Sequence, residues 1–273
     1  MNRRSFLGTI TAATILGNRI TWAANDRKLD KIGLQLYTVR SLLKNDFEGT
    51  LAKVAEAGYR EVELAGLFDR SPQDVRKILD KNGLTVPSSH VDFKTVEGDW
   101  PKALETAHTL GQSFIVCPFI EENMRTPDGW KHAADAFNRA GEASKKAGIQ
   151  FAYHNHNWEF KTDKGEMPYE ILLTKTDPNL VKMEMDLFWT VKGKQDPLTY
   201  FNRYPGRFPL VHVKDMKKNG EMTEVGSGDI DFKKIFAQSE KAGIQHYFVE
   251  HDEPKDPIES IKTSYDYLSK LRF

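Results

Sequence analysis

The 273-residue sequence has little of three features that would each point to a particular class of protein. It holds one cysteine, Cys117, so no disulfide can form within the chain. The apolar run SFIVCPF around this residue favours a small buried side chain over a reactive thiolate. Lysine plus arginine and aspartate plus glutamate both number 39, so the formal net charge is zero. A chain without a basic excess lacks the electrostatic footprint of a nucleic-acid-binding protein, and we expect no nucleic-acid partner.

Long apolar runs are also missing, and the longest one near the N-terminus, TITAATILG, is shorter than a membrane-spanning helix. It follows a basic start with Arg3 and Arg4 and precedes small residues at Thr21 and Ala23. This pattern predicts an export signal peptide over residues 1–23. The arginine pair followed by Ser-Phe-Leu resembles a twin-arginine signal, with an ordinary export signal as the alternative. We therefore expect a periplasmic or otherwise exported protein without membrane contact after removal of the signal.

A glycine-rich turn is absent after the first predicted strand, which continues into LYTVRSLL. An open doubly wound sheet normally carries a phosphate-binding turn there. Along residues 24–273, eight short apolar runs alternate with about eight helical patterns, without a linker or a second domain. This alternation over about 250 residues favours a single closed (β/α)8 TIM barrel.

Helix ends in the sequence agree with this alternation. One helix is predicted to start with Ser71 as N-cap and Pro72 in the first helical position, and to stop at Gly83. Four predicted helices end at a glycine that directly precedes a strand, which predicts left-handed backbone at Gly58, Gly83, Gly148 and Gly243.

Polar residues at the ends of the predicted strands are the candidate site residues, because active sites of such barrels lie at the C-terminal ends of the strands. Side chains alternate between the two faces of a strand, so His154 and His156 of FAYHNHNWEF share one face. The next three strands end in Asp186, His212 and Glu250. Imidazoles and carboxylates that converge on one mouth are suitable ligands for a divalent cation.

Two glutamates in the strands remain ambiguous at this point. Glu63 and Glu184 can equally pair with an interior lysine such as Lys182. An HNH-nuclease interpretation of residues 154–156 is weaker, since the string has three residues and stands between a strand and a helix.

The motifs YHNHNWEF, MDLFW, HVKD and GSGDIDF resemble, in this order, those of xylose isomerase-like barrels. This sugar phosphate isomerase/epimerase superfamily includes tagatose-type 3-epimerases, inosose dehydratases and endonuclease IV. The resemblance covers nearly the whole chain after the signal. It implies a divalent metal ion (Mn, Zn, Mg or Co) held by four residues of strands five to eight, namely His154, Asp186, His212 and Glu250. The endonuclease branch needs three metal ions and a DNA-binding surface, which the neutral charge balance disfavours.

Two positions depart from the sugar epimerases of this superfamily. His154 stands where they carry a glutamate that serves as one of two acid–base groups, and Trp189 stands where they carry a histidine. A symmetric epimerase with two glutamates is therefore not expected.

The resemblance implies removal of a proton next to a sugar carbonyl, through an enediolate that the metal ion stabilises. The expected acid–base groups are Glu250 and a histidine of the fifth strand, His154 or His156, with Glu159 close to the substrate hydroxyls. The expected substrate contacts are Tyr37, His90, Phe188, Trp189 and Lys214.

Three functions stay open for a carbohydrate substrate. The first is a sugar isomerase or epimerase, the second a lyase that acts on 3-keto-glycosides, and the third a sugar-binding barrel without catalysis. Export favours a free sugar, a keto-sugar or a glycoside over a sugar phosphate. The sequence does not indicate an oligomeric state.

Overall fold

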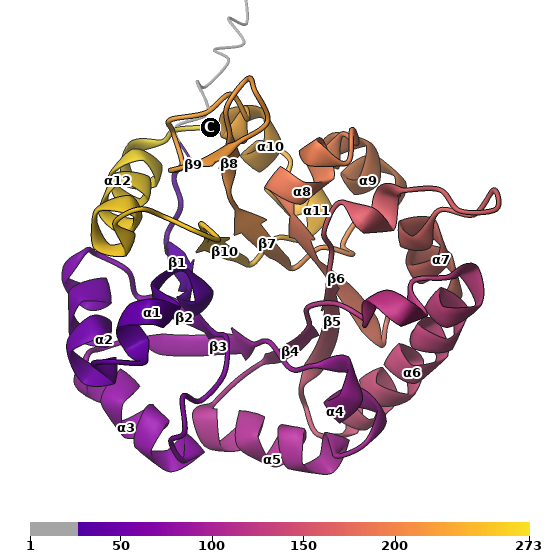
Figure 1. The fold of residues 1–273 in the computed structure, drawn as a ribbon, viewed down its shortest axis with the longest axis horizontal. Helices are drawn as coiled ribbons and strands as arrows, with labels where there is room; N and C mark the ends of the chain where they lie inside the picture. The colour runs from indigo at the N-terminus through magenta and orange to yellow at the C-terminus, as the bar shows by residue number, and fades with distance from the viewer. Residues whose placement is uncertain (1–26) are drawn as a thin grey trace, which may run out of the picture.

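The computed structural model describes residues 27–273, and its central strands form a parallel barrel ringed by helices (Figure 1). A parallel bridge between His90 and Val116 joins the two end strands of the sheet and closes it. This architecture confirms the predicted single (β/α)8 TIM barrel, while the predicted signal peptide lies outside the described residues. The barrel strands are β1 (Gly33–Gln35), β2 (Glu61–Leu64), β3 (Thr85–Ser89), β4 (Phe114–Cys117), β5 (Gln150–His154), β6 (Val181–Asp186), β7 (Leu210–Val213) and β10 (His246–Val249), in the order β3-β2-β1-β10-β7-β6-β5-β4.

Helices cover the outside of the barrel (Figure 1). They are α1 (Arg40–Leu43), α2 (Phe47–Glu56), α3 (Pro72–Lys81), α4 (Phe93–Glu97), α5 (Trp100–Leu110), α6 (Pro127–Lys146), α7 (Pro168–Lys175), α8 (Leu187–Lys192), α9 (Pro197–Arg203), α10 (Phe232–Phe236), α11 (Ser239–Ala242) and α12 (Pro257–Lys270). The three short 3₁₀ turns are η1 (Leu36–Val39), η2 (Glu122–Met124) and η3 (Trp158–Phe160). No helix among residues 27–273 is both long and apolar enough to cross a membrane.

The helix ends confirm the predictions from the sequence. The Ser71 side chain accepts a hydrogen bond from the backbone N–H of Asp74, and Pro72 opens α3. The four glycines before strands have positive φ angles, as a left-handed helix stop requires, at Gly58, Gly83, Gly148 and Gly243.

Two local features differ from the prediction. The first strand stops at Gln35, because the Gln35 side chain accepts the N–H of Tyr37 and starts the turn η1. Tyr37 therefore lies in a 3₁₀ turn at the mouth. A small hairpin of β8 (Asp215–Met216) and β9 (Met222–Thr223) was not predicted, since strands of two residues carry no measurable periodicity.

The interior of the barrel is apolar at one level and polar at the next. A buried apolar cluster comprises Phe114, Val116, Ala152, Leu210 and Phe248. Two residues further along β5, β7 and beyond β10, on the same face, stand His154, His212 and Glu250. Branched apolar side chains usually fill this level of a TIM barrel. Burying ionisable groups there is costly unless they have partners, so the polar level points to function.

Candidate active site at the mouth of the barrel

Three histidine rings converge on one carboxylate oxygen at the bottom of the mouth. Glu184 Oε2 lies 2.9 Å from His90 Nε2, 3.1 Å from His154 Nδ1 and 3.2 Å from His212 Nε2. The side chains of Glu184 and His212 are fully buried, and His154 is nearly so. We call these four residues the inner cluster.

Glu63 of β2 adjoins the inner cluster. It accepts hydrogen bonds from Gln35 Nε2 at 2.7 Å and from Ser88 Oγ at 2.6 Å. Its Oε2 also lies 2.7 Å from His212 Nε2 and 3.2 Å from His90 Nε2. Burial opposes the ionisation of Glu63, but His90 and His212 outweigh it and hold the pKa of this carboxyl well below its usual range.

The alternative that Glu63 and Glu184 pair with Lys182 is wrong. The Lys182 ammonium donates to the carbonyl of Gly206 at the opposite end of β6. Both glutamates pair with histidines instead.

The histidines of the inner cluster differ in their protonation. Burial opposes a charge on His90, but Glu63 and Glu184 outweigh it and raise the pKa of His90 to about 9. Burial lowers the pKa of His154 well below its ordinary value, and the neighbouring His212 lowers it further. The inner cluster therefore combines charged and neutral imidazoles.

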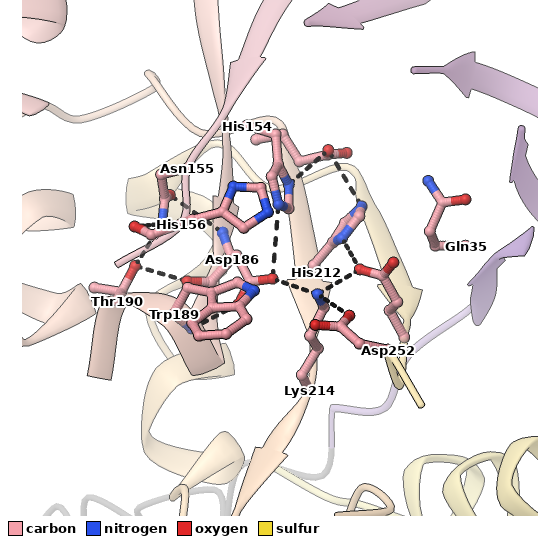
Figure 2. Close-up of polar contacts among 12 residues, drawn as sticks. Gln35, His154, Asn155, His156, Asp186, Trp189, Thr190, His212, Lys214 and Asp252 are labelled. Carbon is pink, nitrogen blue, oxygen red and sulfur yellow. Dashed lines mark hydrogen bonds and ion pairs between the residues drawn. The ribbon is translucent and has the colours of Figure 1, made fainter. Parts of the chain in front are cut away.

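A second group of charges surrounds the buried ammonium of Lys214 (Figure 2). Its Nζ lies 2.7 Å from Glu250 Oε2, 2.7 Å from Asp252 Oδ1 and 3.1 Å from Asp186 Oδ2. Burial opposes the charge on Lys214, but these carboxylates raise its pKa well above the ordinary value. We call Lys214 and the three carboxylates the lysine cluster.

His212 links the two clusters through its two ring nitrogens. Its Nε2 faces the inner cluster, whereas its Nδ1 lies 2.7 Å from Glu250 Oε2. Burial opposes the ionisation of Glu250, but Lys214 and His212 hold its pKa below its usual range. Burial raises the pKa of Asp186 to about 6 despite Lys214, and Asp186 Oδ2 makes an ion pair without a hydrogen bond.

The amide of Asn155 fixes the end of β6. Its Oδ1 accepts the backbone N–H of Asp186 at 3.3 Å, and its Nδ2 donates to Thr190 Oγ1. Thr190 in turn donates to the backbone carbonyl of Asp186 at 2.6 Å. The Asp186 side chain caps α8 by accepting the N–H of Trp189. Sequence reasoning did not assign this positioning role to Asn155.

The motifs HVKD and GSGDIDF meet around one carboxylate. Asp215 Oδ2 accepts the backbone N–H groups of Gly226 and Gly228, both at 2.9 Å. Its Oδ1 accepts those of Met216 and Ile230. These bonds hold the loop beside Lys214, and they explain why the two motifs occur together.

A pocket of about 540 Å³ opens above both clusters, within the size range of small-molecule sites. The predicted contacts Tyr37, His90, Trp189 and Lys214 all line it. The other lining residues are Ala65, Pro118, Phe119, His154, His156, Glu250, Asp252 and Glu253. Phe188 is buried and packs against the Trp189 ring, so it does not line the pocket as the sequence predicted.

His156 belongs to a stack of flat groups at the pocket wall. Its ring lies 4.1 Å from the Trp158 ring centre at an angle of 11°, and the Arg125 guanidinium lies 3.9 Å from the same Trp158 ring. Burial, assisted by Lys214, lowers the pKa of His156 well below its ordinary value. Its Nδ1 is buried and has no hydrogen-bond partner.

Glu159 lies behind the pocket wall and not at the substrate position expected for it. Its side chain is fully buried, Oε1 accepts the Tyr153 hydroxyl at 2.6 Å, and Oε2 accepts the backbone N–H of His156 at 2.8 Å. Burial raises the pKa of Glu159 to about 7. Because the turn η3 directs this carboxylate inward, Glu159 supports the backbone of His156.

Polar atoms without partners gather around the mouth. Within residues 27–273, nine buried side-chain nitrogen or oxygen atoms lack a hydrogen bond, and five of them belong to His156, Trp158, Glu184, Asp186 and Trp189. Buried polar groups normally have partners, so this concentration indicates a site shaped for a ligand.

The potential metal ligands form two sets that share His212. One set is the inner cluster, and the other comprises Asp186, His212 and Glu250. The sequence grouped His154 with the second set and left Glu184 ambiguous. Glu184 precedes Asp186 by two residues on the same strand face, and this spacing was the available signal for it.

The conserved pattern of xylose isomerase-like TIM barrels matches residues 51–271. The chain belongs to this family. Its parent group, the sugar phosphate isomerase/epimerase superfamily, is represented by a solved structure from Parabacteroides distasonis that is 32% identical to the chain. The match to that structure has a TM-score of 0.78 and covers 90% of this chain and 97% of the chain in that structure.

Further relatives of the family broaden the range of activities. An inosose dehydratase of Lacticaseibacillus casei is 26% identical over 265 residues, which cover 83% of this chain and 87% of that protein. The structure of an IOLI protein with a bound zinc atom has a TM-score of 0.70 at 16% identity and shows a shared fold. This match covers 89% of this chain and 99% of the IOLI chain. The protein is thus an enzyme of the sugar isomerase/epimerase superfamily, whose members include isomerases and dehydratases.

Proposed function

We propose that this enzyme uses a divalent metal ion to remove a proton from the carbon next to the carbonyl of a carbohydrate, as a sugar isomerase or epimerase. The observation that carries the proposal is the unpaired Nδ1 of His156, which lies in the wall of a pocket lined by potential metal ligands. A base with a free nitrogen beside an electrophilic site is the arrangement that this reaction needs.

The donor groups at the mouth fit a divalent ion. Buried imidazole nitrogens and carboxylate oxygens lie within 4.8 Å of one another in two sets, and each set has at least one member that lines the pocket. A bound ion would supply Lewis-acid stabilisation of the negative charge that forms as the proton leaves. The IOLI protein, which has a similar fold, was solved with zinc.

The remaining pocket residues have roles in binding. Tyr37 and Trp189 offer aromatic faces that suit the apolar face of a sugar ring, and Tyr37 is also the most exposed large apolar side chain among residues 27–273. Asp252 reaches the pocket with a carboxylate that can accept hydrogen bonds from hydroxyl groups, and Lys214 holds this carboxylate in place. His156 takes the proton, and the stack with Trp158 holds its ring in place.

Elimination is the second candidate, in which proton removal is followed by loss of a leaving group, as in a 3-keto-glycoside lyase. Two observations favour it. The curated relatives include an inosose dehydratase. In addition, the chain has His154 in place of the fifth-strand glutamate, and both ring nitrogens of His154 face carboxylates. The fifth strand therefore offers no carboxylate as the second proton-transfer group of a two-glutamate epimerase.

Incubation of the metal-loaded protein with free ketoses and with 3-keto-glycosides in heavy water tests the proposal. Deuterium incorporation next to the carbonyl is the expected result, and the presence or absence of aglycone release separates elimination from isomerisation. The His156→Gln variant should lose about 10²–10⁴-fold of the exchange rate. His132→Gln, which changes an exposed histidine on α6, should keep it. Sugar binding without any exchange would instead support the binding-only barrel.

We also propose that the chain is exported through residues 1–23. The support is the basic start, the short apolar run and the small residues before the cleavage point. Expression in a Gram-negative host should yield a periplasmic product that begins after Ala23. Replacement of Arg3 and Arg4 by lysine should block a twin-arginine route and leave an ordinary signal working. A product that keeps residues 1–23 in the cytoplasm would contradict export.

A further inference from the structure

We propose that the inner cluster is the metal site of this chain, and that the ammonium of the lysine cluster occupies the alternative position between Asp186 and Glu250. The proposal rests on the proposed function for the role of the ion. Binding itself, however, can be measured without any substrate.

The geometry of the inner cluster fits four-coordinate binding. In a tetrahedral site with metal–ligand bonds of about 2.0–2.1 Å, neighbouring ligand atoms lie about 3.3–3.4 Å apart. Glu184 Oε2 lies 2.9, 3.1 and 3.2 Å from the nitrogens of His90, His154 and His212. All four ligand atoms lie within 4.8 Å of one another, so side-chain shifts of about 1 Å would bring them to the tetrahedral spacing, and His90 at the pocket edge can supply part of the movement.

The charges of the inner cluster lack a permanent cation. Among residues 27–273, neither Glu184 nor Glu63 forms an ion pair with a lysine or an arginine, since histidines are their ion-pair partners. Glu184 Oε1 is buried and has no hydrogen-bond partner at all. A buried carboxylate with one oxygen unpaired and the other facing three imidazole nitrogens is a costly arrangement that a bound metal ion would stabilise.

The surroundings of the inner cluster provide the outer partners of metal-bound histidines. With His212 Nε2 as ligand, its Nδ1–H points to Glu250 Oε2 at 2.7 Å. With His154 Nδ1 as ligand, its Nε2 faces Asp186 Oδ2 at 3.8 Å. Metal-ligating histidines commonly donate their second N–H to a carboxylate, which fixes the ring orientation. Glu250 is thereby placed to orient His212, whereas Asp186 would have to move closer to His154 to form the corresponding hydrogen bond.

The lysine cluster already contains its cation (Figure 2). The Lys214 ammonium lies 2.7 Å from Glu250 Oε2 and 3.1 Å from Asp186 Oδ2. A divalent ion between these carboxylates would have to displace the ammonium or bear its repulsion at close range.

The two sets also differ in the metal that they favour. Three imidazoles and one carboxylate suit zinc or cobalt, whereas one imidazole and two carboxylates suit manganese or magnesium better. We therefore expect the protein to prefer zinc and cobalt over manganese and magnesium.

Metal titration of the metal-free full-length protein tests the proposal. The probe is Co²⁺, which gives intense visible absorption when four-coordinate and weak absorption when six-coordinate, with Zn²⁺ and Mn²⁺ as competitors. Glu184→Gln and Asp186→Asn form a matched pair, since both convert a buried carboxylate of β6 into an amide. We expect Glu184→Gln to weaken binding more than about 100-fold, beyond the effect of losing an outer partner. Asp186→Asn should weaken it by about 10–100-fold at most, the cost of losing an outer partner.

His90→Gln provides a second test if Glu184→Gln does not fold, because His90 belongs to the inner cluster alone and its ring is partly exposed. Circular dichroism checks the fold of each variant. If Asp186→Asn abolishes metal binding, or if both carboxylate variants weaken it equally, the inner cluster is not the metal site. The proposed function would then stay intact. Stronger binding of Mn²⁺ than of Zn²⁺ would also overturn it. A wild-type protein that binds none of the ions would reject this proposal and metal-assisted catalysis together.

Discussion

The inner cluster and the lysine cluster lie next to each other, and they stabilise their buried carboxylates in two different ways. In the inner cluster, imidazole nitrogens surround Glu184. In the lysine cluster, the ammonium of Lys214 neutralises Asp186, Glu250 and Asp252. An imidazole can give up its proton and bind a metal ion, whereas a lysine held by carboxylates keeps its charge. With the metal site as proposed, similar ligand types in one mouth form one candidate site for an ion and one site that an ammonium already fills.

A third way of stabilising a buried carboxylate occurs at Glu159, behind the pocket wall. Glu159 has neither an imidazole nor an ammonium beside its carboxyl group, and burial raises its pKa to about 7. It is therefore stabilised in part by protonation, with Tyr153 and the backbone of His156 as hydrogen-bond donors. Three substitutions test these three ways of burying a carboxylate, and a fourth tests the aromatic stack at the pocket wall.

Replacement of Lys214 by methionine should cause the largest loss of stability. It leaves three buried or half-buried carboxylates without their ammonium, and breaking such a group costs about 3–5 kcal/mol. Urea unfolding of the metal-free variant measures this loss. Lys182→Met is the control, because its ammonium bonds a single backbone carbonyl, and it should cost about 1 kcal/mol. A loss for Lys214→Met no larger than for the control would contradict the account of the lysine cluster.

Replacement of Glu63 by glutamine should destabilise the metal-free protein by about 2–3 kcal/mol, since it removes a charged acceptor of four hydrogen-bonding groups. The same change at Glu61, two residues earlier on β2, should cost about 1 kcal/mol, because Lys31 and His246 there are partly exposed. Urea unfolding compares the two. Equal costs would show that the inner cluster does not depend on Glu63.

Replacement of Glu159 by glutamine should make the protein more stable at alkaline pH. A glutamate ionises near pH ~4.3 in the unfolded chain, whereas burial raises the pKa of Glu159 to about 7 in the fold. Between these values the folded state binds more protons, so the free energy of unfolding of the wild type falls as pH rises. The Glu159→Gln variant has no carboxyl group to ionise at this position, so its free energy of unfolding does not fall in this way.

Unfolding curves from pH 4 to pH 8 measure the effect. The variant should gain on the wild type through this window, by about 3–4 kcal/mol at pH 8, and the difference should level off above pH 7. Tyr153, Tyr169 and Arg125 interact electrostatically with this carboxyl, and none of the three titrates in this window in the unfolded chain. A pH-independent difference would contradict a neutral Glu159.

Replacement of Arg125 by methionine should have the smallest effect. It removes the cation–π contact with Trp158, which is worth about 0.5–1 kcal/mol. Both clusters stay intact, so metal stoichiometry should not change. Urea unfolding and cobalt titration check the two expectations, and a loss of metal binding would show that the stack supports the inner cluster.

Much of the fold and part of the site could be predicted from the sequence. The alternation of apolar runs with helical patterns, the cap at Ser71 and the glycine stops are local signals, and all were confirmed. Residue alternation also placed His154 and Asp186 on inward faces. The turn that directs Glu159 away from the pocket could not be predicted, because a single 3₁₀ turn leaves no periodic pattern.

The sequence by itself determined which residues face the interior of the barrel, since strand periodicity is a property of the chain alone. Only the tertiary structure decided how deep each of these residues lies and which of them meet. The stagger of neighbouring strands sets the level of each side chain, and this stagger brings Glu184 to three histidines and Lys214 to three carboxylates. Those meetings depend on contacts between distant strands, which no local pattern encodes.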